Sequence, residues 1–132
     1  MKAFVFLLLS VTGLPALAQV DSAAQSKPEE IFTVCEQPPK FPGGNAALGE
    51  YFRQNLRYPE AARQAKREGR VFVTFIITYQ GKIEDVQALN HRGKGMDEEA
   101  VRLVSNMPNW IPGRQAGRPV NVRYNLPINF QL

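Results

Sequence analysis

The chain has 132 residues, and its 16 basic and 12 acidic side chains give a formal net charge of +4. This length suits one domain with a core of ordinary size, and the charge excess is too small to indicate a nucleic-acid-binding protein. A single histidine and a single cysteine exclude an internal disulfide and offer no spacing typical of a metal site. We therefore expect a small protein without a cofactor.

Residues 1–18 have the pattern of a secretory signal peptide, with one early lysine, an apolar run and a small-residue exit. Cleavage is predicted between Ala18 and Gln19. The apolar run is shorter than the about 20 residues that span a bilayer, so we expect export to the periplasm, a soluble protein and no stable membrane span after cleavage. Residues 19–35 are predicted to form a flexible leader, in which only residues 31–34 resemble a short edge strand.

The remaining residues, 36–132, are predicted to form one domain that begins with a turn-rich stretch and a helix. Asn45 is a candidate cap for this helix. The apolar side chains that recur at helical spacing along it are Leu48, Tyr51, Phe52 and Leu56.

A second helix is predicted from Pro59, which favours the first helical position, to Glu68, with Gly69 as its stop. Its alanines share one face, and its charged side chains lie opposite them. Glutamates are mixed among the bases, so we interpret the basic stretch of residues 57–70 as a solvated helix surface and predict no nucleic-acid partner.

Strands are predicted on either side of a turn at residues 79–82. Residues 71–78 are β-branched and aromatic on both faces, which favours a central strand. The second strand, residues 83–89, alternates imperfectly, which indicates a bulge near Glu84 and Asp85.

A third helix is predicted over residues 97–106, with acidic residues in its first turn, where the helix dipole favours them. The chain then ends in residues 120–130, where apolar and polar residues alternate strictly. Pro127 cannot donate to a ladder, so this strand is expected at a sheet edge or at a bulge. The pattern as a whole predicts an α+β fold, with a small antiparallel sheet of about three strands packed on one face by two to three helices.

No catalytic constellation stands out. His91 lies in a glycine-rich loop without a serine or cysteine motif, and we interpret it as a solvated loop residue. The carboxylates near Asp97 are explained by helix capping. We therefore predict that the protein is not an enzyme. The terminal strand offers a different activity, because an exposed edge presents backbone donors and acceptors that can take up another extended chain.

Six motifs are similar, in order and spacing, to those of the TonB carboxy-terminal domain family in its Bacteroidetes-type form. They are FPGG (41–44), YPEAAR (58–63), GRVFVTF (69–75), GKIEDV (81–86), DEEAVRLVSNMPNWIPG (97–113) and GRPVNVRYNLPINF (117–130).

The resemblance implies a periplasmic domain that binds the TonB box, a short segment of TonB-dependent outer-membrane receptors. The segment would be added as a further strand to the sheet of the domain. The resemblance also implies a structural role for Trp110 with Pro112, which would pack the last helix against the sheet. The residues that it places at the peptide-binding surface are Arg57, Tyr58, Pro59, Val122, Arg123, Tyr124 and Asn125.

Two alternatives differ from this soluble binding module. Family members that transduce energy have an uncleaved membrane anchor and a long Pro-rich linker, so this chain would be a transducer only if residues 3–18 stay attached. The domain could instead be a structural one that associates with the cell wall or forms a homodimer. Cys35 is either an inert thiol or forms an intermolecular disulfide.

Overall fold

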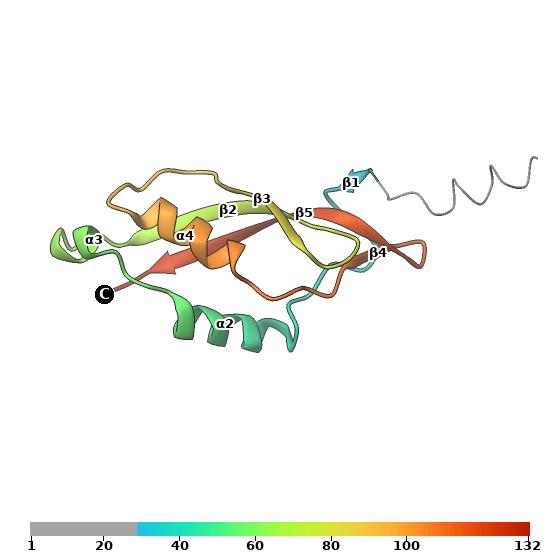
Figure 1. The fold of residues 1–132 in the computed structure, drawn as a ribbon, viewed down its shortest axis with the longest axis horizontal. Helices are drawn as coiled ribbons and strands as arrows, with labels where there is room; N and C mark the ends of the chain where they lie inside the picture. The colour runs from blue at the N-terminus through green and yellow to red at the C-terminus, as the bar shows by residue number, and fades with distance from the viewer. Residues whose placement is uncertain (1–28) are drawn as a thin grey trace, which may run out of the picture.

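The computed structural model describes residues 29–132, so the expected signal peptide and most of the leader lie outside the described residues. In residues 29–132, three helices lie beside a sheet, with α2 and α4 against one of its faces (Figure 1). The elements in chain order are β1 (Ile31–Phe32), α2 (Gly44–Asn55), α3 (Glu60–Gln64), β2 (Gly69–Ile77), β3 (Ile83–Ala88), α4 (Met96–Ser105), β4 (Gly113–Gln115) and β5 (Arg118–Phe130).

The α+β class and the covering of one sheet face by helices are confirmed, but the sheet is larger than predicted. Within the described part of the chain it has five strands, in the order β1-β5-β2-β3, with β4 paired to β5 alone. The three long strands are antiparallel, as expected. β1 pairs with β5 in parallel, which makes the sheet mixed. β1 lies within the short edge strand expected at residues 31–34 and is at one end of the strand order, whereas the three-residue β4 is too short to produce a period-two signal in the sequence.

The core lies between the helices and one face of the sheet. β2 is central, as its two partly apolar faces predicted, and β5 shows the expected alternation of buried and exposed positions from Leu126 onward. The largest fully buried side chains are Val71, Val73, Phe75, Ile77, Met96, Leu103, Val104, Ile128 and Phe130.

The first helix has the predicted apolar face but a different start. Leu48 is buried, and Tyr51 and Phe52 are partly buried against the core. Gly43, with φ 88°, occupies the capping position, and no side chain caps the helix. The prediction that Asn45 is the cap was therefore wrong, because the helix already begins at Gly44.

The second helix is half as long as predicted. α3 ends at Gln64 because Lys66 adopts a left-handed conformation (φ 53°), in which Lys66 N–H bonds to the Arg63 carbonyl and Arg67 N–H to that of Ala62. These two bonds form a Schellman stop without glycine. Gly69, the predicted stop, is the first residue of β2 instead.

The turn and the bulge of the β2–β3 hairpin are confirmed. Gly81 has φ 85°, and Thr78 N–H bonds to the Lys82 carbonyl across the turn. The register of the two strands shifts between Thr74 and Ile76, opposite the left-handed residue Asp85.

Candidate functional site

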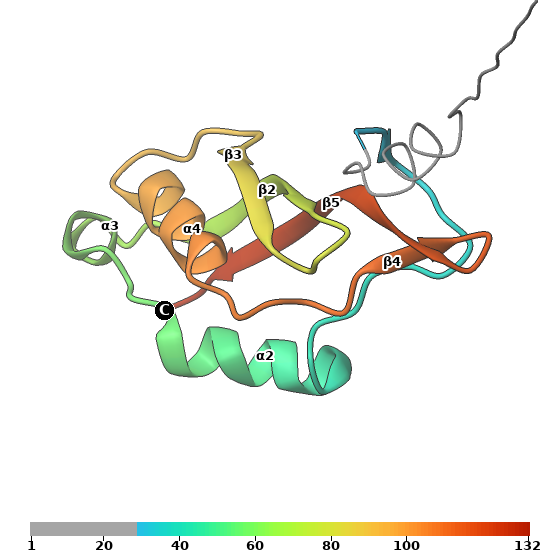
Figure 2. The ribbon, with the colours of Figure 1, turned by 45° about the vertical axis from the view of Figure 1, so that its right-hand side comes forward.

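The outer edge of β5 is open over most of its length. Residues 122–130 pair with β2 on one side, whereas β4 and β1 pair only with residues 118–122. Among residues 29–132, no strand pairs with the other side of residues 123–130 (Figure 2). The expectation that the strand around Pro127 lies at a sheet edge is thus confirmed for this stretch.

The register determines which backbone groups face that open edge. Phe72 turns its backbone toward β3, because its N–H bonds to Asn90 Oδ1 and its carbonyl accepts from Leu89 N–H. Pro127 is opposite Phe72 and therefore turns its own backbone away from β2. Because backbone direction repeats every two residues along a strand, the backbone groups of Arg123, Asn125 and Asn129 also point away from β2. These three residues present both a donor and an acceptor, and Pro127 presents only its carbonyl.

The side chains of the predicted β5 site lie on the two faces of this edge. Val122 is buried on the helix face, and half-buried Tyr124 packs there against the Trp110 ring, with 5.3 Å between centroids. Arg123 lies on the opposite face, where it pairs with Asp85 at 2.9 Å. The hydrogen bond from Arg123 lowers the pKa of Asp85. Asn125 is exposed.

The other predicted site residues, Arg57, Tyr58 and Pro59, lie at the carboxyl end of the same strand. The Tyr58 ring packs edge-on against Phe130, with 5.7 Å between centroids, and its hydroxyl donates to the Arg67 carbonyl. Six residues of extended chain separate Phe130 from Tyr124, which amounts to roughly 20 Å. The two halves of the predicted site therefore lie near opposite ends of the open edge, not in one cluster.

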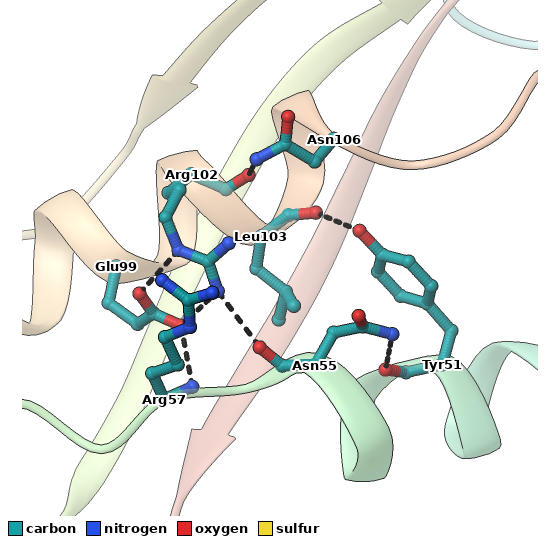
Figure 3. Close-up of polar contacts among 7 residues, drawn as sticks. All are labelled: Tyr51, Asn55, Arg57, Glu99, Arg102, Leu103 and Asn106. Carbon is teal, nitrogen blue, oxygen red and sulfur yellow. Dashed lines mark hydrogen bonds and ion pairs between the residues drawn. The ribbon is translucent and has the colours of Figure 1, made fainter.

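A polar network holds the segment that carries Arg57 (Figure 3). Glu99 of α4 accepts from Arg57 N–H at 2.7 Å and from Arg102 at 2.8 Å, and Arg102 also donates to the Asn55 carbonyl at the end of α2. Burial opposes ionisation of Glu99, but these hydrogen bonds and positive charges outweigh it and lower its pKa. The network fixes the exit of α2 against α4.

A groove adjoins the open edge on its helix side. It has a volume of about 370 Å³ and is lined by Pro39, Lys40, Phe41, Gly44, Asn45, Trp110 and Tyr124. Trp110 is 4% exposed and packs edge-on against both Phe41 and Phe75, which agrees with the structural role expected for it. Sequence reasoning missed the groove, because Lys40 and Phe41 lie in a proline-rich loop without periodicity.

Metal and membrane features can be addressed only for the described part of the chain. Within residues 29–132, no three histidine, cysteine or acidic side chains lie close enough together to hold a metal ion. No helix of that part is long and apolar enough to cross a membrane. His91 is exposed as predicted, with its Nδ1 atom 3.6 Å from Asp97.

The fold is that of a small α+β domain, and among residues 29–132 no strand pairs with the outer side of its terminal strand over residues 123–130. In comparisons with known proteins, the family of the Gram-negative bacterial TonB protein C-terminal matches residues 54–132. The protein TonB of Salmonella typhimurium is 32% identical over 92 residues, which cover 69% of this chain but only 37% of that protein. The chain belongs to the TonB C-terminal family.

Proposed function

We propose that this protein is a periplasmic binding module of TonB-dependent transport that takes up an extended segment of an outer-membrane receptor as an added strand. The added strand would pair with β5 along residues 123–129, and binding would occur without turnover. The observation that carries the proposal is the outer edge of β5, with which no strand among residues 29–132 pairs over residues 123–130, while the inner edge pairs with β2 over residues 122–130. Membership of the TonB C-terminal family supports the link to transport.

The backbone of the edge suits this role. Arg123 and Asn125 offer a donor and an acceptor each, and strand addition draws its affinity from such main-chain bonds. Pro127 removes one donor, which makes the edge a poorer template for unlimited pairing. The Arg57–Pro59 segment would then meet one end of the added strand, next to Phe130.

Asn125→Pro tests the added strand directly. The substitution removes an N–H that faces the open edge while sparing the β2 ladder, and Pro127 already occupies an equivalent position of the same strand. A receptor segment captured from periplasmic extract, identified by mass and then synthesised, is expected to bind the variant about tenfold or more weakly. Titration calorimetry measures the loss, and circular dichroism checks the fold.

Matched variants separate the backbone from the side chain. Asn125→Ala keeps the N–H and should bind like the wild type, as should Lys66→Glu, which reverses a charge outside the edge. A proline at Tyr124 is unsuitable, because that residue pairs with Phe75 and its N–H faces β2. Wild-type affinity in a folded Asn125→Pro variant would place the binding surface elsewhere.

A second candidate is a membrane-anchored energy transducer. It is supported by the TonB relative, because the matched residues cover only 37% of that protein, which is therefore longer than this chain. The two candidates differ in the fate of residues 1–18. Mass measurement on the protein from its native host decides between them. An amino terminus at Gln19 contradicts the transducer, whereas an intact Met1 in the inner membrane contradicts the soluble module.

A further inference from the structure

The groove is lined by Tyr124 of β5, and the chain neighbours of Tyr124, Arg123 and Asn125, turn their backbone groups to the open edge. Its floor consists of aromatic rings, with Phe41 and Trp110 buried and Tyr124 half-buried. Its rim carries the exposed side chains of Lys40 and Asn45. Aromatic floors with a few polar rim groups are typical of sites that bind one bulky side chain of a ligand.

An added strand would lie about 4.8 Å from β5, and its side chains would alternate between the two faces of the sheet. Tyr124 lies on the helix face, since it packs against Trp110 and Phe75. Residues of the added strand that face the helices at this level would therefore point toward the groove. Asn125 points to the opposite face, where its side chain is exposed.

The charge of the groove indicates which segment it favours. Among the lining residues of the described part of the chain, Lys40 is the only charged side chain, and none of the ion pairs within residues 29–132 uses it. The first turn of α2, on the groove rim, carries no acidic residue. The groove therefore complements a ligand with negative charge close to its apolar anchor.

We propose that the groove is the specificity pocket for the added strand, and that it selects a segment with one aromatic or large aliphatic side chain next to an acidic residue. The proposal rests on the strand-addition function above and deepens it. Phe41, Trp110 and Tyr124 would contact the apolar side chain, and Lys40 would contact the carboxylate.

A guest series of synthetic peptides tests the pocket on the full chain. Each peptide alternates threonine and valine and carries one glutamate and one guest position, filled by Phe, Leu, Ala or Lys. The Phe and Leu peptides should bind about tenfold to a hundredfold more tightly than the Ala peptide, because burial of a large apolar side chain supplies that gain. Fluorescence anisotropy of labelled peptides measures the affinities.

The single tryptophan of the chain reports where the guest side chain goes. Because Trp110 forms part of the floor, its emission should shift with the Phe peptide and stay unchanged with the Ala peptide. Replacing the glutamate by glutamine should weaken binding about threefold, and Lys40→Gln should remove that difference.

Asn45→Tyr fills the groove from its rim and should abolish the preference for Phe over Ala. Ala46→Tyr, at the next helical position and outside the groove lining, is the matched control and should keep it. Equal affinities across the guest series, or a preference that survives Asn45→Tyr, would overturn the pocket but leave strand addition standing. A natural segment that binds Asn125→Pro normally would overturn the proposed function itself.

Discussion

Gly81→Ala is expected to destabilise the domain by at least about 3 kcal/mol, a large part of the 5–15 kcal/mol that stabilises a typical domain. A Cβ at this position would lie 2.1 Å from the Trp110 carbonyl oxygen. The backbone has φ +85° there, which by itself costs an L-residue about 1–2 kcal/mol. Trp110 N–H also bonds to the Gly81 carbonyl at 2.8 Å, so the clash would push the Trp110 loop off the core.

Two other glycines are the controls for this substitution. Gly117 has φ +77° but open space around it, so Gly117→Ala isolates the backbone strain and should cost about 1 kcal/mol. Gly49 lies inside α2 with nothing nearby, and alanine there should stabilise the domain by up to about 1 kcal/mol. Urea denaturation followed by circular dichroism ranks the three. If Gly81→Ala lowers the free energy of unfolding no more than Gly117→Ala does, the contact of Gly81 with Trp110 is dispensable for stability.

Glu99→Gln is expected to cost about 2–4 kcal/mol. Glu99 is 8% exposed, and its carboxylate accepts from both Arg102 and Arg57 N–H. The Arg102 side chain is 33% exposed, so the cost lies below that of breaking a fully buried charged pair. The matched control is Glu98→Gln, because Glu98 is exposed in the same helical turn and should change stability by less than about 0.5 kcal/mol.

The same residue predicts a pH dependence of stability. The pKa of Glu99 is lower in the folded protein than its ordinary value, which is about 4.3 in an unfolded chain. The unfolded chain then binds the proton more tightly, so the contribution of Glu99 is fully present above about pH 4.3 and is lost as pH falls through the folded pKa. The stability difference between wild type and Glu99→Gln should therefore shrink in acid. A difference that stays constant from pH 7 to acid would contradict the assignment.

Much of the candidate site was predictable because the last strand has a strong local pattern. Alternation along residues 120–130 predicts which side chains face the core, which the structure follows from Leu126 onward, and Pro127 indicates an edge. The direction of each backbone N–H was not predictable, because it depends on the pairing of Phe72 with Pro127 and on the bonds from Phe72 to the β3 side. The groove was also hidden, since it joins a loop near residue 40 to Trp110 and Tyr124.

The sequence by itself determined the elements that rest on local periodicity: the apolar face of α2, the β2–β3 hairpin with its bulge, α4 and the alternating terminal strand. Only the tertiary structure decided where α3 stops. The helix ends just before the left-handed residue Lys66, although a left-handed conformation costs a residue other than glycine about 1–2 kcal/mol, so the sequence favoured the later Gly69. The tertiary structure also decided that β1 and β4 pair with one part of β5, whereas no strand within residues 29–132 pairs with the outer side of residues 123–130. Such pairings join residues far apart in the chain, and the pattern of a strand of two or three residues is too short to predict which strand it pairs with.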